Sequence, residues 1–160
     1  MEPYNNFLTS SIRVSLQDIP SIMLKHFMEA CHTGNVLAVK SCLADSSFEP
    51  NELTNSGRLE RHGHNIISTG FIEACYDGQR DIVSLLLQDS RIDVNKGDKY
   101  EKTGFMHACS NGHREIVRLL LQDSRVDVSK GDSLGMTGFM ICMLEWTYRY
   151  SEIIITRFTN

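Results

Sequence analysis

A tripeptide that recurs at a fixed interval constrains the fold of this chain more than any other feature. Thr69-Gly70-Phe71 is followed by Thr103-Gly104-Phe105 and by Thr137-Gly138-Phe139, with a spacing of 34 residues each time. When residues 69–102 are aligned with residues 103–136, most positions are identical. Similarity at a fixed period of about 20–50 residues is typical of a solenoid, in which each unit buries its apolar face against its neighbours. We therefore expect a stacked array rather than one globular core.

Each unit is predicted to contain two short helices. Thr103 can cap a first helix through about Ser110, because its hydroxyl can accept a hydrogen bond from a backbone N–H at the helix start. Gly112 can adopt a left-handed conformation at little steric cost, so the chain can reverse there into a second helix over residues 114–122. This second helix is apolar on nearly every side and needs cover from neighbouring units. The polar segment 123–132 that follows is typical of a loop and β-turn.

The motif of one unit is T-G-F-x-x-A-C, followed in order by Gly, Ile-Val, Leu-Leu-Leu and Asp-Val. It resembles the ankyrin repeat, whose pattern is T-P-L-H-x-A…G-H…I-V-x-L-L-L…A-D-V-N. The tetratricopeptide repeat shares the period, but its Trp, Leu-Gly and Tyr landmarks are missing. Two departures recur. Glycine replaces the proline of the family, and Ile72, Met106 and Met140 replace its histidine. The first change loses a residue preset for a helix start and the second loses a polar tether, so we expect repeats that are individually looser than consensus ones.

The resemblance sets the expected fold class and domain limits. We predict a leader over residues 1–21 and an all-α ankyrin-repeat solenoid over residues 22–160, built from about four stacked helix–turn–helix units with short β-turn or hairpin connectors. Residues 27–34 match residues 71–78 at a spacing of 44, so the first repeat carries a ten-residue insertion. The predicted units are repeat 1 over about 24–68 with a long inserted connector over 52–68, repeat 2 over 69–102, repeat 3 over 103–136 and a degenerate repeat 4 over 137–160.

Charge and hydropathy restrict the possible partners and location. The 16 basic and 20 acidic side chains leave a net charge of −4, without the basic excess that phosphate binding requires. No apolar run approaches the ~18 residues needed to span a bilayer, and the first twenty residues lack the pattern of a secretory signal. We therefore expect a cytoplasmic monomer that binds neither nucleic acid nor membrane.

The five cysteines are an odd number without a close-spaced pair, which favours reduced thiols over a disulfide framework. Cys31, Cys75 and Cys109 occupy the same position in three repeats, where a small thiol suits close helix packing. Because neighbouring helices pack ~8–10 Å apart and a disulfide requires Cα atoms within ~7 Å, we expect equivalent cysteines of successive repeats not to pair.

The sequence contains no convincing catalytic, cofactor or metal motif. His62 and His64 are the only close histidine pair, and no further residues are spaced to complete a set of three or four ligands. Ser110 and His113 lack a third orienting group, and the Walker, GxSxG and HExxH motifs are missing. We predict a non-enzymatic protein without cofactor. The alternative is a metal-dependent enzyme or redox protein that uses the inserted loop with His62 and His64.

The binding hypothesis depends on where the two similar copies differ. Differences gather in residues 99–102 against 133–136, and in residues 76–77 against 110–111. By the resemblance, these segments are the hairpin tips and the exposed end of the inner helix, which line the concave groove where ankyrin repeats hold partners. The candidate protein-binding residues are Tyr76, Asp77, Lys99, Tyr100, Lys102, Ser110, Asn111, Ser133, Leu134 and Met136. Drift at unconstrained surface positions would give the same pattern of differences.

Together these features predict an adaptor that binds another protein through its concave face. Large apolar or amphipathic side chains at Tyr76, Tyr100, Leu134 and Met136 would supply most of the binding energy. The glycine-containing repeats are similar to those of large ankyrin families in giant DNA viruses and intracellular bacteria, which would make the partner a host protein and the location a host cell. A second alternative is a truncated member of a larger repeat protein, as the weak fourth unit suggests.

Overall fold

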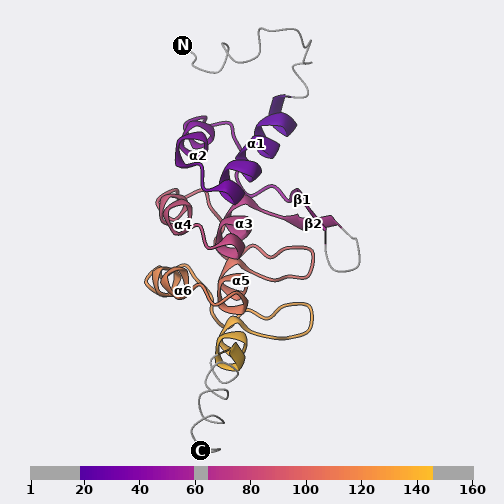
Figure 1. Ribbon diagram of the computed structural model, residues 1–160, viewed down its shortest axis with the longest axis vertical. Helices are drawn as coiled ribbons and strands as arrows, with labels where there is room; N and C mark the ends of the chain where they lie inside the picture. The colour runs from indigo at the N-terminus through magenta and orange to yellow at the C-terminus, as the bar shows by residue number, and fades with distance from the viewer. Residues whose placement is uncertain (1–18, 60–64, 146–160) are drawn as a thin grey trace, which may run out of the picture.

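The molecule is a stack of helix pairs, described by a computed structural model over residues 19–59 and 65–145. Figure 1 shows two columns of helices along the long axis of the stack. The inner column contains α1 (Ile19–Thr33), α3 (Gly70–Asp77) and α5 (Gly104–Ser110), and the outer column contains α2 (Val36–Leu43), α4 (Arg80–Leu86) and α6 (Arg114–Leu121). A further helical segment begins at residue 138 and continues through residue 145. The predicted all-α solenoid is confirmed.

The connectors between helix pairs project from the stack on the side opposite the outer helices (Figure 1). In the first repeat, β1 (Thr54–Leu59) and β2 (Asn65–Ser68) pair in antiparallel orientation. The next two connectors are shorter and are closed by single bridges, Gly97 with Thr103 and Gly131 with Thr137. The long connector predicted over residues 52–68 thus contains an antiparallel hairpin, in which pairing satisfies backbone N–H and C=O groups of the two strands. His62 and His64 lie outside the described residues.

The helix ends use the residues that the sequence indicated. The hydroxyl oxygens of Thr69 and Thr103 accept hydrogen bonds from the backbone N–H groups of Ile72 and Met106, at 3.3 and 3.4 Å. Gly112 has a φ of 71°, so the turn between α5 and α6 uses the left-handed conformation that glycine adopts at low cost. No helix within the described residues is long and apolar enough to cross a bilayer.

The glycine of each Thr-Gly-Phe motif makes room for the phenylalanine of the preceding repeat. A Cβ atom built on Gly70 would lie 2.4 Å from Phe27 Cε1, and one on Gly138 would lie 2.3 Å from Phe105 Cδ1. Both distances are too short for two carbon atoms, so neither position has space for a side chain. Phe27 and Phe105 are correspondingly buried. The glycine that replaces the proline of the family is therefore a packing residue that matches a bulky neighbour.

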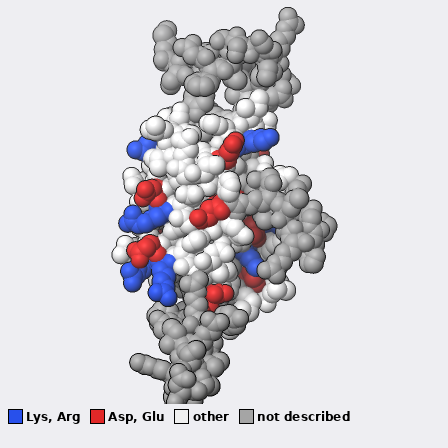
Figure 2. Space-filling view, in the orientation of Figure 1, with Lys and Arg blue, Asp and Glu red and all other residues white. Residues whose placement is uncertain are grey.

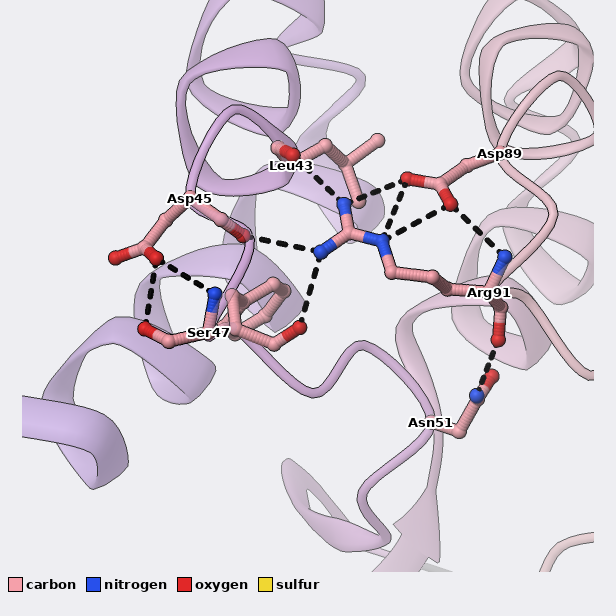
Figure 3. Close-up of polar contacts among 7 residues, drawn as sticks. Leu43, Asp45, Ser47, Asn51, Asp89 and Arg91 are labelled. Carbon is pink, nitrogen blue, oxygen red and sulfur yellow. Dashed lines mark hydrogen bonds and ion pairs between the residues drawn. The ribbon is translucent and has the colours of Figure 1, made fainter.

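The loops after the outer helices are joined across repeats by the Arg91 side chain (Figure 3). Its guanidinium donates to the carbonyl oxygens of Leu43, Asp45 and Phe48 in the first repeat, at 2.7, 3.0 and 3.2 Å. The same group forms an ion pair of 2.7 Å with Asp89 in its own loop. The hydrogen bond from Arg91 lowers the pKa of the Asp89 carboxyl, which partial burial alone would raise.

An asparagine completes each of these joints. The Asn51 side chain donates to the Arg91 carbonyl oxygen at 2.6 Å and accepts from the backbone N–H of Asp93 at 2.8 Å. One repeat later, Asn95 makes the same two bonds with the Arg125 carbonyl oxygen and the backbone N–H of Asp127. Asp-Ser-Arg occurs at residues 89–91 and again at 123–125, and each copy takes part in the same kind of hydrogen-bonded joint with the loop before it.

One cysteine pair departs from the expectation of reduced thiols. Cys109 and Cys142 form a disulfide with a Cα–Cα distance of 4.9 Å. The expectation of reduced thiols is wrong for these two cysteines, because the stacking of the fourth repeat on the third brings together two residues that are 33 positions apart. Cys142 aligns with Ala108 rather than with Cys109, so the two bonded cysteines are not equivalent positions. Cys31 and Cys75 keep buried thiols, and desolvation raises the pKa of each.

Candidate protein-interaction surface

The end of β2 and the tips of the two shorter connectors form a continuous edge, which we call the tip surface and define as Ile67, Lys99, Tyr100, Ser133 and Leu134. Neighbouring tips are joined through the backbone: Lys99 N–H donates to the Ile67 carbonyl at 3.3 Å, and Ser133 N–H donates to the Tyr100 carbonyl at 2.9 Å. Leu134 is 84% exposed, and Tyr100 and Ile67 are 42% and 40% exposed. Large apolar side chains therefore lie in solvent on a backbone held in place by hydrogen bonds.

Buried aspartates fix the shape of the two shorter tips. Asp98 Oδ1 accepts from the backbone N–H groups of Tyr100 and Lys102 at 2.8 and 3.0 Å. Asp132 Oδ1 accepts in the same way from Leu134 and Met136, both at 2.9 Å. The aspartate in each Gly-Asp pair is therefore the residue that folds the turn, although the sequence analysis did not select it.

A histidine ties the first of these turns to the inner helix. His107 Nε2 lies 2.9 Å from Asp98 Oδ2, and the histidine and aspartate side chains are 15% and 4% exposed. Burial alone would raise the pKa of the Asp98 carboxyl, but its hydrogen bonds with His107 and with the turn N–H groups outweigh burial and lower it. The turn is thus held to α5 as well as closed on itself.

The predicted residues of the tips differ in how far they face solvent. Tyr100 and Leu134 are exposed as expected, and so are Lys99 and Ser133. Lys102 and Met136 are half-buried, so they face solvent less than predicted. The ammonium of Lys99 lies 4.9 Å from the centroid of the Tyr100 ring, a cation–π geometry that orients the ring.

The predicted residues at the inner-helix ends are partly used to join repeats. The Tyr76 carbonyl oxygen accepts from Asn111 Nδ2 and interacts with His113 Nε2, each at 2.9 Å. The Tyr76 side chain is 39% exposed and its ring centroid lies 5.5 Å from that of His107. Ser110 is exposed. Asn111 therefore has a structural role in addition to any contact with a partner, whereas Tyr76 presents its ring to solvent beside the first tip.

The structure also brings together three side chains that the sequence analysis did not group. His32 Nδ1 and Asp77 Oδ2 lie 2.6 Å apart, and one ligand atom each from His32, Glu73 and Asp77 lie within 4.8 Å of one another. His32 and Asp77 are 45 positions apart in the chain. The ten-residue insertion hides their proximity, because it shifts the register of the first repeat against the second.

An apolar cavity of about 400 Å³ lies at the end of the described stack, where α5 and α6 meet the segment that begins at residue 138. Its walls include Phe105, Val117, Leu121, Phe139 and the disulfide cysteine Cys142. The residues that follow in the fourth repeat, from 146 onward, lie outside the described part of the chain.

Comparison with known families identifies the repeat. A family profile described as ankyrin repeats (3 copies) matches residues 27–132 and, in an overlapping match, residues 71–154. The chain belongs to the ankyrin-repeat family. Comparison with curated proteins finds no similar sequence. Ankyrin repeats are protein-interaction modules, and the chain is therefore a protein-interaction domain in this general sense.

Proposed function

We propose that this ankyrin-repeat protein is a non-enzymatic adaptor that binds another protein through the tip surface and the adjoining ends of the inner helices. The observation that carries the proposal is the solvent exposure of Tyr76, Tyr100 and Leu134. His107 links the first two, because its ring contacts Tyr76 and its Nε2 is hydrogen-bonded to the aspartate that folds the Tyr100 turn. Aromatic and aliphatic anchors of this kind supply most of the energy in protein interfaces.

The backbone beneath these side chains favours binding. Each of the two shorter tips is closed by an aspartate and is hydrogen-bonded to the connector before it, so little backbone ordering remains to oppose association. An anchor on a rigid turn loses only side-chain freedom when a partner covers it. Tyr76 and Leu134 belong to different repeats, so a partner that contacts both would extend along the stack.

Surface charge supports a protein partner. Figure 2 shows basic and acidic groups interleaved along the outer-helix edge, with uncharged groups over much of the centre of this face. The net charge of −4 adds no basic field of the kind that attracts phosphate backbones. The charge distribution therefore favours a protein as the partner. The proposal also includes a monomeric state and a cytoplasmic location, which is the host cytoplasm if the chain comes from a virus or bacterium.

A pull-down with matched variants tests the surface. The variant Tyr76→Ala/Tyr100→Ala/Leu134→Ala removes the three anchors, whereas Leu37→Ala removes an apolar group on α2 that is 80% exposed and lies away from the tips. We expect the triple variant to lose specific partners that wild type and Leu37→Ala both retain, with unchanged helicity by circular dichroism. Identical partner sets for wild type and the triple variant would rule out this surface.

A further inference from the structure

The junction between the first two inner helices carries a mixed set of metal-binding side chains. His32 lies near the end of α1, and Glu73 and Asp77 lie on α3. The two acidic residues are four positions apart, which places them on one face of the helix. Since one ligand atom from each of the three lies within 4.8 Å of the others, the set spans both repeats at a single point.

We propose that His32, Glu73 and Asp77 form a binding site for a divalent transition-metal ion of the Zn²⁺ type. One imidazole nitrogen and two carboxylate oxygens are a ligand set that such ions accept, with metal–ligand distances of ~2.0–2.2 Å. Ligand atoms around one ion then stand ~3.3 Å apart, as these bond lengths require. His32 Nδ1 and Asp77 Oδ2 are 2.6 Å apart, so binding needs them to separate by less than an ångström and replaces their hydrogen bond with two metal bonds.

Burial differs among the three ligands in a way that suits a site with open coordination positions. Glu73 is 3% exposed, and the buried hydroxyl of Ser68, which is the last residue of β2, donates a hydrogen bond to it. The Asp77 side chain is 17% exposed and the His32 side chain is 51% exposed. The inner carboxylate is thus fixed in place while the imidazole faces solvent, which leaves a route for the ion and room for water ligands.

The next junction along the stack provides a natural comparison. The positions that correspond to His32, Glu73 and Asp77 hold Tyr76, His107 and Asn111. There, His107 pairs with Asp98 at 2.9 Å, but no third metal-binding side chain joins that pair among the described residues. One protein therefore contains both a two-residue hydrogen-bonded pair and a three-residue ligand set, and His107 supplies the matched control.

The proposal can be tested by calorimetric titration with ZnCl₂. The full chain is purified without a polyhistidine tag and stripped of metal before the titration. We expect one equivalent of Zn²⁺ to bind, with Mg²⁺ binding far more weakly because it prefers six oxygen ligands. His32→Ala and Asp77→Asn are each expected to weaken Zn²⁺ binding by about tenfold or more, as the loss of a ligand should cost at least what the loss of a second-layer contact does. His107→Ala should bind Zn²⁺ as wild type does.

A second readout keeps the test independent of folding defects. Zn²⁺ should raise the melting temperature of wild type and of His107→Ala, because an ion that binds only the folded state stabilises it. The melting temperature of His32→Ala should not change when Zn²⁺ is added. His32 is half exposed, so His32→Ala is expected to keep its circular dichroism spectrum. Affinity unchanged in His32→Ala, the absence of saturable binding, or binding lost only in His62→Ala/His64→Ala would each overturn the assignment.

Discussion

The third and fourth repeats begin with the same Thr-Gly-Phe motif, yet the two phenylalanines lie in opposite environments. Phe105 is 4% exposed and Phe139 is 62% exposed. Phe105 is covered because Gly138 of the following repeat has no side chain to compete for its space. No equivalent glycine covers Phe139 within the described residues. The comparison shows that the motif does not bury its own phenylalanine: each repeat depends on the one that follows it.

Truncation of the two phenylalanines should give the largest difference between the repeats. We expect Phe105→Ala to lower the free energy of unfolding by ~3–5 kcal/mol, as deletions of buried aromatic side chains do. Phe139→Ala should cost less than about 1 kcal/mol, because its side chain is largely in solvent. Urea unfolding measures both, and equal losses would contradict the dependence on the following repeat.

The match between glycine and phenylalanine can be tested with a double-mutant cycle. Gly70→Ala should cost ~1–3 kcal/mol, because the new Cβ would stand 2.4 Å from Phe27 Cε1. Phe27→Leu reduces the bulk at this point, so the double variant should lose less stability than the sum of the two single variants. Strict additivity in chemical denaturation would show that Gly70 and Phe27 are not matched in size.

The two arginine joints should differ in strength. Arg91 donates to three carbonyl oxygens of the preceding repeat, whereas Arg125 donates to one, that of Leu87. We expect Arg91→Ala to cost ~1–2 kcal/mol and Arg125→Ala about half as much, since each such bond is partly screened by solvent. Thermal and urea melts of both variants provide the measurement, and a larger loss in Arg125→Ala would be inconsistent with this assignment.

The smallest expected effect concerns acid stability at the turn that Asp98 folds. The pKa of Asp98 is lowered in the folded protein, so its ionised form adds stability above the unfolded carboxyl pKa of about 3.9. That stability is lost as the pH falls through the lower folded value. Asp98→Asn should therefore flatten the decline in stability below about pH 4. Unfolding curves of wild type and of Asp98→Asn from pH 6 to pH 2.5 provide the measurement, and equal declines for the two proteins would contradict the prediction.

The sequence was sufficient where the structure depends on contacts that recur with the repeat. The spacing of the Thr-Gly-Phe motifs predicted the stacked helix pairs, and Thr103 and Gly112 predicted the start of α5 and the turn after it. Sequence comparison also selected Tyr100 and Leu134, because exposed tips vary between copies while most buried positions do not. These features are either local or recur with the repeat, and both kinds can be recognised from one sequence.

The sequence was insufficient where residues from different repeats meet. The strands β1 and β2 lie in an insertion that has no second copy for comparison. The pairing of Cys109 with Cys142 crosses a repeat boundary between positions that do not align, and the approach of His32 to Asp77 does so as well. The repeat motif identifies the positions that shape a single unit. Contacts between units depend on how one unit is shifted against the next in the stack, which the motif does not specify.

The fit between each glycine and the preceding phenylalanine limits how repeats of this kind can be exchanged. Glycine at this position leaves space for the phenylalanine of the preceding repeat, so this contact is kept when one glycine-containing repeat of the array replaces another. A consensus ankyrin repeat with proline at the glycine position would collide with that phenylalanine if grafted after it. Recombination therefore preserves the stack when the glycine–phenylalanine pair is kept across the splice, and chimaeras with proline-type repeats need a smaller residue on the preceding unit.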